Sequence, residues 1–429
     1  MRRVVCLIVL FAFSLTYAAA DEPEVRHTFQ WQPYSDPSTC QEENSWWTTP
    51  QGIRVFLNRT RRDASGTETT DSNQKAAPKT HLVIFATPNG NSLEETSGSA
   101  PLPELSFRFG IQHILAQTRL LRTLDPNTSL VLAIVQAPKL SWPAFRGADP
   151  KAGVVIPELV QTLSEAVNAD EITLSGHSGG GAFLLEYITR TSSIPTTVRR
   201  FLFLDATYSW DDMLHRAKVD EWLRQDSELR LVSIAYDDRE ITLNGRKVVG
   251  PDGGTWRATE RMRNGFAQTR MLKDDVTGPF LRTQDEGRQI VLLRHPNPDN
   301  KILHTALVGD MNGLIAGMTF GTPQENSWGK LGDGPVYQPY IPGAPLRAPS
   351  RWNAELVVDA PKLELSLPPR LESMRGGREL AGELERLVGR DREDCIASEL
   401  LSGNMPQASR ELALIRYRAT DTAGTDHDV

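Results

Sequence analysis

Cysteine is scarce in this sequence. Its 429 residues contain three cysteines, and the first of them, Cys6, lies inside an N-terminal apolar run. A small domain held together by many disulfides is therefore excluded. The sequence also has no His-Glu-x-x-His motif and no cluster of cysteines. These absences predict a protein without a metal site, and nothing in the sequence indicates a cofactor.

An excess of positive charge is also missing. Lysine and arginine number 47 against 54 aspartates and glutamates, which gives a formal net charge of −7. Proteins that bind nucleic acid usually concentrate positive charge, so nucleic acid is not an expected partner.

The N-terminal apolar run is too short to span a membrane. It covers residues 4–17, follows Arg2 and Arg3, and ends in three alanines. A span needs about 20 apolar residues, whereas this arrangement is typical of a secretory signal. We therefore expect a signal peptide at residues 1–20, a secreted or periplasmic protein, and no transmembrane span after its removal. An oxidising compartment would allow Cys40 and Cys395 to form a disulfide, with two free thiols as the alternative.

Short apolar runs alternate with segments of helical spacing. With 39% hydrophobic residues the chain can form a sizeable core. This alternation predicts an α/β fold with a mostly parallel central sheet and helices on both faces. The expected strands are residues 52–57, 82–86, 130–135, 172–174, 201–204, 229–236 and 289–293, and the expected helices are residues 105–124, 154–167, 182–189 and 210–224.

The expected division of the chain follows from changes in composition. Residues 21–80 are interpreted as an N-terminal extension with a polar loop, and residues 81–340 as the main domain. A polar insert at 239–288 is either a cap over a site or a surface decoration. Prolines mark a linker at 341–369. Residues 370–429 form a C-terminal extension, either helical or a shortened module.

One motif carries chemical information. Gly176-His177-Ser178-Gly179-Gly180 fits G-x-S-x-G and follows a short apolar run. In a nucleophile elbow, a sharp turn from strand to helix exposes a serine hydroxyl above the edge of a sheet. Glycines flank the serine because side chains there would collide with the neighbouring backbone.

Through this motif and the order of the strands around it, residues 81–320 resemble the α/β-hydrolase superfamily, in particular its secreted esterase-like and lipase-like members. The resemblance implies that Ser178 is the nucleophile and that an acid and a histidine follow it in that order. A serine needs a base to take its proton, and a carboxylate to orient that base.

The resemblance places the histidine between the last strand and a final helix. His304 fits best, because apolar residues of helical spacing follow it directly, and His295 at the preceding strand end is the alternative. For the acid, the resemblance favours Asp238, which follows the penultimate long strand. Asp237 is close behind it, because strand ends are uncertain by a few residues. Asp205, one strand earlier, occupies a position that some lipase-like members use.

An oxyanion also needs hydrogen-bond donors. The resemblance implies the amide of Gly179 and an amide from the loop after an early strand. Asn89-Gly90-Asn91 resembles the His-Gly-x turn of that loop, so we expect Asn91 to supply the second donor.

The expected function is that of a serine hydrolase acting on a small or polymeric carboxylic ester through an acyl-enzyme at Ser178. An amidase or acyltransferase would use the same residues. The other alternative is a secreted binding protein that has kept the fold without turnover.

Overall fold

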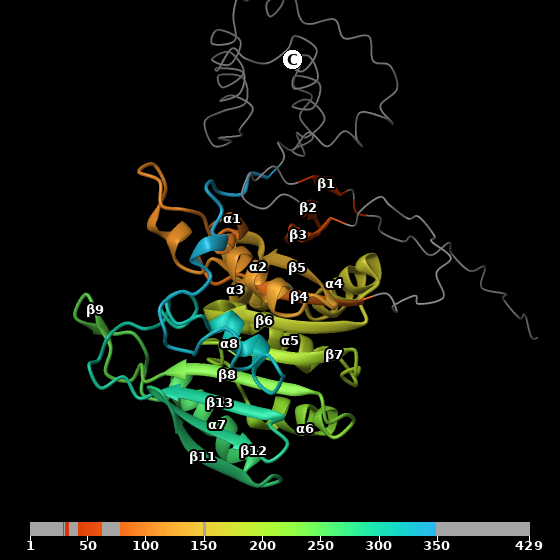
Figure 1. Ribbon diagram of the computed structural model, residues 1–429. Coiled ribbons are helices and arrows are strands. Elements are labelled where there is room, and N and C mark those ends of the chain that lie inside the picture. The colour runs from red at the N-terminus through yellow and green to blue at the C-terminus, as the bar shows by residue number, and fades with distance from the viewer. Residues whose placement is uncertain (1–28, 30, 34–41, 62–77, 149–151, 349–429) are drawn as a thin grey trace, which may run out of the picture. The chain divides into compact units, whose positions relative to one another are not determined.

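The computed structural model describes residues 29, 31–33, 42–61, 78–148 and 152–348 (Figure 1). The chain divides into two units, Met1–Gly343 and Ala344–Val429. The expected signal at 1–20, both Cys40 and Cys395, most of the expected linker and the C-terminal extension at 370–429 lie outside the described residues.

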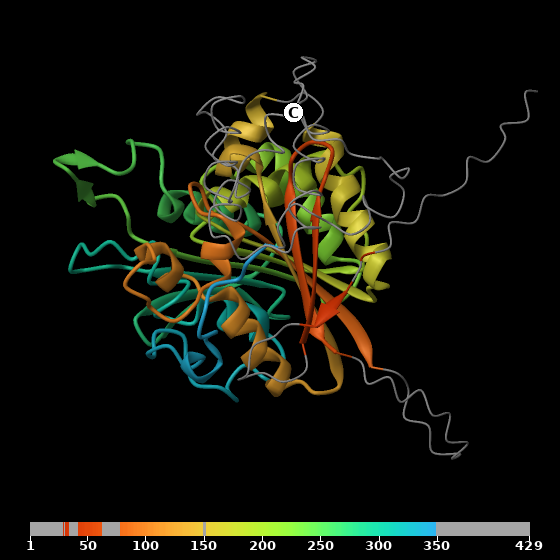
Figure 2. The ribbon, with the colours of Figure 1, turned by 90° about the horizontal axis from the view of Figure 1, so that it is seen from above.

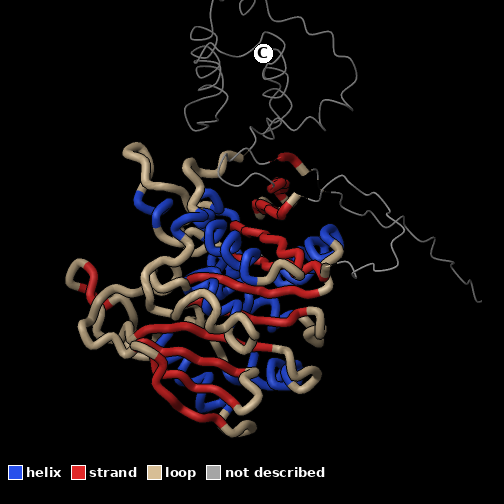
Figure 3. The backbone as a smooth tube through the Cα atoms, in the orientation of Figure 1, coloured by secondary structure: helices blue, strands red, loops and turns tan. Residues whose placement is uncertain are grey.

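In the described part of the first unit, a large sheet runs in the order β1-β2-β3-β5-β4-β6-β7-β8-β13-β12-β11 (Figures 1 and 3). Its strands are β1 (Gln32–Pro33), β2 (Glu42–Thr48), β3 (Arg54–Thr60), β4 (Lys79–Ala86), β5 (Thr128–Gln136), β6 (Glu171–His177), β7 (Val198–Leu204), β8 (Arg230–Tyr236), β11 (Leu272–Thr277), β12 (Phe280–Asp285) and β13 (Ile290–His295). Strands β5, β4, β6, β7, β8 and β13 are parallel, and the pairs toward both edges are antiparallel.

The central strands form where the sequence has continuous apolar runs. All seven residues of β8 are buried, as are the last five residues of β4 and of β7. Burial on both faces is typical of parallel strands that are covered by helices. The apolar runs therefore predicted the interior of the sheet because neither face of these strands meets solvent.

Helices cover both faces of the sheet (Figure 2). Helices α2 and α8 pack on one face against β5, β7 and β8, while α4, α5 and α7 contact the sheet from the other face and α6 packs between α5 and α7. This arrangement confirms the predicted fold class. The helices are α1 (Leu93–Ser97), α2 (Ile114–Leu124), α3 (Trp142–Ala148), α4 (Ala152–Val167), α5 (Gly181–Arg190), α6 (Asp212–Leu223), α7 (Thr255–Phe266) and α8 (Gly313–Thr319), with 3-10 turns η1 (Phe107–Gly110), η2 (Pro138–Leu140), η3 (Ser178–Gly180) and η4 (Gln338–Tyr340).

The expected helix at residues 105–124 is divided in two. The 3-10 turn η1 ends at Gly110, and α2 begins only at Ile114. His113 between them has a backbone φ of 49°, in the left-handed region. A right-handed helix cannot continue through such a residue, so the apolar spacing overestimated the length of this helix.

The segment 239–288 contains more regular structure than its polar sequence suggested. It includes the small hairpin of β9 (Thr242–Leu243) and β10 (Arg246–Lys247), helix α7, and the antiparallel strands β11 and β12, which extend the large sheet. The outer strand β11 exposes the charged residues Lys273, Asp274 and Asp275, and charges on an edge strand discourage pairing with other chains.

The segment before the expected main domain also contributes to the sheet. Strand β3 pairs with β5, and β2 pairs with β3. Residues 42–48 and 54–60 are therefore part of the sheet. Within the described ranges, no helix combines the length and the apolar composition needed to cross a membrane.

Candidate active site

Ser178 lies at the turn between strand β6 and helix α5. Its backbone φ is 53°, in the left-handed region, which is uncommon for a residue with a side chain and costs about 1–3 kcal/mol. The turn itself is η3, and α5 begins at Gly181. A strained serine between a strand and a helix has the backbone geometry of a nucleophile elbow.

Two glycines allow this turn to close. A Cβ atom at Gly180 would lie 2.3 Å from the carbonyl oxygen of Ala86 at the end of β4, and one at Gly176 would lie 2.9 Å from the carbonyl carbon of Gly180. Both distances are shorter than carbon atoms tolerate, so any larger residue would force the elbow away from its neighbours. The steric argument made from the motif therefore holds at both positions.

His304 and Asp205 are in direct contact. The Nδ1 atom of His304 lies 2.5 Å from Oδ2 of Asp205. Asp205 follows β7 and is fully buried, and its other carboxylate oxygen accepts a hydrogen bond from the hydroxyl of Thr255. Buried charges need such partners. The carboxylate fixes the orientation of the imidazole and leaves its Nε2 atom without a partner among the described residues.

His177 connects this pair to the elbow. Its Nε2–H donates to the carbonyl oxygen of His304 at 2.9 Å, and the two rings are 4.5 Å apart between centroids. On the other side, Nδ1 of His177 accepts a hydrogen bond from Nε2 of Gln112 at 3.2 Å. Burial, followed by the neighbouring His304, holds the pKa of His177 well below its usual value. His177 is therefore a neutral donor that holds the backbone of His304 next to the elbow.

Asp238, the acid favoured from sequence, has a different partner. It is buried, and its Oδ2 atom accepts the backbone N–H of Thr255 at 3.0 Å. Its Oδ1 atom has no hydrogen-bond partner among the described residues. Burial, and then the charge of Asp205, raise its pKa to about 6. Asp238 thus binds the backbone of Thr255, whose hydroxyl binds Asp205, and it makes no hydrogen bond to His304 in the described structure.

The other two alternatives also have structural partners. Asp237 binds the guanidinium of Arg239 through both oxygens, at 2.8 Å and 2.6 Å. Nδ1 of His295 accepts the backbone N–H of Asn297 at 3.0 Å, and the ring lies edge-on to Phe280. Of the three aspartates and two histidines considered from sequence, the described structure joins only Asp205 and His304.

The loop after β4 approaches the elbow through Asn89. A Cβ atom at Gly179 would lie 2.1 Å from Oδ1 of Asn89, so the exposed Asn89 side chain lies directly over the residue that follows Ser178. The N–H of Asn91 instead donates to the Pro88 carbonyl within the turn, at 3.4 Å, and the N–H of Gly90 donates to Leu140. The turn thus presents Asn89, rather than the predicted Asn91, to Gly179.

Sequence reasoning did not find three neighbours of the site. His177 occupies a variable position of the motif, Gln112 lies in a loop, and Thr255 begins α7 within the insert. Tyr208 is a further neighbour, 39% exposed with its ring 6.3 Å from that of His304. The only available signal was the histidine directly before Ser178.

Within the described ranges, no group of three or more His, Cys, Asp or Glu side chains is arranged to hold a metal ion.

No family model matches the sequence, and no curated protein is similar to it. Solved structures with similar backbones include a cold-adapted esterase from an Arctic intertidal metagenomic library, at 9% identity and a TM-score of 0.31, covering 62% of this chain and 90% of that one. Another is the siderophore hydrolase EstB from Aspergillus nidulans, at 13% identity and a TM-score of 0.35, covering 69% and 99%.

These similarities are weak, so the fold is assigned from the chain's own geometry. The parallel centre of the sheet carries helices on both faces, and the elbow follows the central strand β6. Ser178 follows β6, Asp205 follows β7, and His304 lies between β13 and α8, which is the chain order serine, acid, histidine expected for this fold. With this sheet, this elbow and this chain order, the protein has the α/β-hydrolase fold that the sequence resembled.

Proposed function

We propose that this protein is a serine hydrolase that cleaves a carboxylic ester, with Ser178 as nucleophile, His304 as base and Asp205 as the orienting acid. The observation that supports it most is the 2.5 Å contact between His304 Nδ1 and Asp205 Oδ2, in a histidine that His177 ties to the elbow. A buried carboxylate that orients an imidazole, which is itself bonded to the residue before a strained serine, is the arrangement a serine hydrolase needs.

The contact determines which nitrogen acts as the base. Because Nδ1 of His304 faces Asp205, Nε2 is the atom that takes the proton from Ser178 Oγ. The freed oxygen attacks the ester carbonyl carbon and forms a tetrahedral intermediate. Its collapse breaks the bond to the alcohol, which leaves with the proton from Nε2. Water, deprotonated by the same nitrogen, then releases the acid and restores the serine.

The negative oxygen of the intermediate needs donors that are already in place. The Gly179 amide is one, because it directly follows the nucleophile. For the second, the position of Asn89 over Gly179 favours its side-chain amide, since the N–H of Asn91 is used within its own turn. Loss of one such donor typically lowers kcat by about 10²- to 10³-fold.

Hydrolysis of a series of nitrophenyl esters of increasing acyl length tests the proposal. Ser178→Ala and His304→Ala should abolish turnover. Ser209→Ala, at an exposed position after β7, and His295→Ala should retain it. If folded wild-type protein hydrolyses neither these esters nor the matched anilides, and transfers no acyl group to added alcohols, the alternative of a non-catalytic binding protein is favoured.

We also propose that the chain is exported and that Cys40 pairs with Cys395. The N-terminal sequence supports the first proposal, and an oxidising compartment would permit the second. Mass spectrometry of protein recovered from the native host should give a mature chain starting near Asp21. Alkylation of the unreduced, denatured chain should add no label. Two labelled thiols would contradict the disulfide, and an intact Met1 would contradict the cleaved signal.

A further inference from the structure

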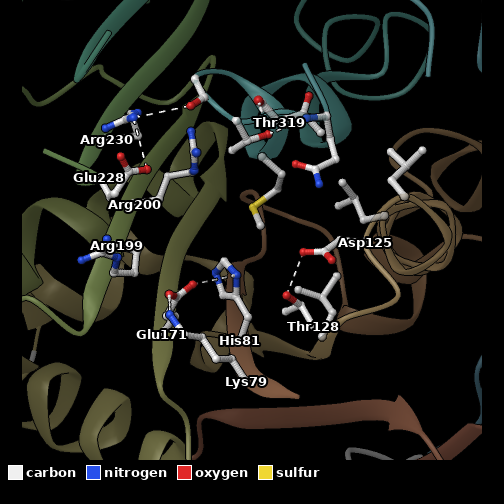
Figure 4. Close-up of a pocket in the computed structure, with 17 residues that line it drawn as sticks. Lys79, His81, Asp125, Thr128, Glu171, Arg199, Arg200, Glu228, Arg230 and Thr319 are labelled. Carbon is white, nitrogen blue, oxygen red and sulfur yellow. Dashed lines mark hydrogen bonds and ion pairs between the residues drawn. The ribbon is translucent and has the colours of Figure 1, made fainter. Parts of the chain in front are cut away.

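A pocket of about 360 Å³ lies at the opposite end of the parallel strands from Ser178 (Figure 4). The first residues of β4, β5, β6, β7 and β8 line it, together with helices α2 and α8. Glu171 at the start of β6 lines the pocket while Ser178 follows its end, so the strand separates them by about 20 Å. The pocket is therefore distinct from the proposed catalytic site.

Two buried arginines form one wall of this pocket. Arg200 of β7 and Arg230 of β8 are direct neighbours across the two parallel strands and are 6% and 5% exposed. In Figure 4 they lie on the side of the pocket opposite Asp125 and Thr128. Like charges placed side by side on neighbouring strands destabilise a sheet, and a buried charge without a counter-ion adds to that cost.

Arg200 has no acidic partner in the described part of the chain. Its Nη1 atom donates to the carbonyl oxygen of Gly317 at 2.9 Å, and no carboxylate of the described residues lies within ion-pair distance of its guanidinium. Burial, and then the charge of Arg230, lower its pKa to about 9. At neutral pH Arg200 is therefore still a cation, and it forms no ion pair within the described residues.

Arg230 is only weakly neutralised. The nearest carboxylate is that of Glu228, 3.6 Å from Nη2, and the Glu228 side chain is 65% exposed. Nη1 of Arg230 donates to the Leu229 carbonyl at 3.0 Å, while its Nε–H has no partner among the described residues. Nη1 also donates to the Ser227 carbonyl and Nη2 to the Gly321 carbonyl, so Arg230 contributes mainly its positive charge beside that of Arg200.

The acids around the pocket are engaged with other groups. Asp125 accepts a hydrogen bond from the hydroxyl of Thr128 at 2.8 Å, and Glu171 pairs with Lys79 at 3.2 Å. Farther along the same face, Glu325 binds both Arg282 and Arg288 at 2.8 Å. None of these carboxylates forms an ion pair with either arginine, and Glu325 acts on Arg200 only through its more distant charge, which raises the pKa of Arg200 against the effect of burial.

We propose that the pocket binds a small molecule carrying a phosphate group, which Arg200 and Arg230 hold together. Arg200 presents the N–H donors that its bond to Gly317 leaves unused, Arg230 adds a second positive charge beside it, and charge-assisted bonds of this kind are stronger than neutral ones. The dianion would supply the direct ion pair that Arg200 lacks among the described residues. The ligand is either free inorganic phosphate or a phosphate monoester. In the second case, the organic part of the monoester would occupy the rest of the pocket.

Thermal unfolding with added anion tests this proposal. Inorganic phosphate and glycerol phosphate are each compared with sodium chloride at equal ionic strength. A ligand that binds only the folded protein raises the midpoint by mass action, by roughly 3 °C at tenfold excess over Kd for a domain of this size. A response to both anions identifies the phosphate group as the ligand, and a response to glycerol phosphate alone identifies a monoester.

Two substitutions of buried arginines provide the matched comparison. Arg200→Met removes the unpaired charge and keeps a long side chain, so the variant should unfold at the same temperature as the wild type or higher, and should not respond to phosphate. Arg294→Met removes an arginine that is 7% exposed on β13 and does not line the pocket; it should respond as the wild type does.

If Arg200→Met does not fold, Arg230→Gln and isothermal titration of wild-type protein with phosphate replace it. Absence of a phosphate-specific response in the wild type, or an undiminished response in Arg200→Met or Arg230→Gln, would overturn the proposal.

Discussion

The side chain of His177 donates a hydrogen bond to the backbone carbonyl of His304 at 2.9 Å. The residue that precedes Ser178 therefore holds the loop that carries the proposed base. This bond joins the elbow at the end of β6 to a segment more than a hundred residues later in the chain, and it sets the position of the imidazole relative to the serine.

His177→Phe should lower kcat by about 10²-fold and leave KM nearly unchanged. Phenylalanine keeps the ring against His304 but lacks the N–H that binds its carbonyl, and small displacements of a catalytic group can cost this much. Steady-state kinetics with a nitrophenyl ester measures both parameters. A variant that loses activity only through a raised KM would show that His177 acts on substrate binding and not on the position of His304.

Asp205→Asn and Asp238→Asn form a matched pair for identifying the acid. Both side chains are buried and both contact Thr255. Asp205→Asn should reduce kcat by about 10⁴-fold, because the amide no longer orients and stabilises the imidazolium. Asp238→Asn should stay within a few-fold of wild type. The opposite ranking of the two variants would restore Asp238, the first choice from sequence, as the acid.

Asp238 should make the protein less stable as pH rises. Burial, and then Asp205, raise its pKa to about 6 from the usual 3.8, so the folded state binds its proton more tightly than the unfolded state. The free energy of unfolding should fall as pH increases from about 4 to about 6, by up to about 3 kcal/mol from this group.

Denaturant unfolding at a series of pH values measures this effect. Asp238→Asn should remove the decline. Asp237→Asn should keep it, because burial raises the pKa of Asp237 but its bonds to Arg239 outweigh that and lower it overall. An unchanged pH dependence in Asp238→Asn would mean that another group titrates in this range.

Asn89→Ala should reduce kcat by about 10²-fold, as expected for the loss of one oxyanion donor. Asn91→Ala should leave kcat within a few-fold, because the N–H of Asn91 remains in its turn and its buried Nδ2 has no partner among the described residues. A loss of kcat in Asn89→Ala alone supports the Asn89 side chain as the donor, whereas an unchanged kcat in both variants would favour the backbone amide of Asn91, which neither substitution removes. Equal losses in both would indicate that the whole loop moves.

Much of the sheet could be predicted because its central strands are buried on both faces. Strands β4, β5 and β8 appear in the sequence as continuous apolar runs. Strand β11 gave no such signal, since four of its six residues are exposed and three of these are charged. The helix predicted at residues 105–124 was too long because apolar spacing does not reveal the left-handed backbone of His113.

The proposed acid shows where sequence reasoning reaches its limit. Asp205 and Asp238 both follow buried parallel strands and both reach the same edge of the sheet. Which one meets His304 depends on how the loop after β13 lies across that edge, a long-range relationship without a local pattern. The arginine pocket is equally hidden, because its residues come from separate strands and helices far apart in sequence.

Covalent labelling tests the central claim most directly. A fluorophosphonate reacts only with a serine whose hydroxyl is activated, and peptide mapping by mass spectrometry identifies the labelled residue. The account predicts a single adduct on Ser178, formed by wild-type protein, much slower in Asp205→Asn, and absent in Ser178→Ala. Folded wild-type protein that takes up no label, or that is labelled on a serine other than Ser178, would contradict it.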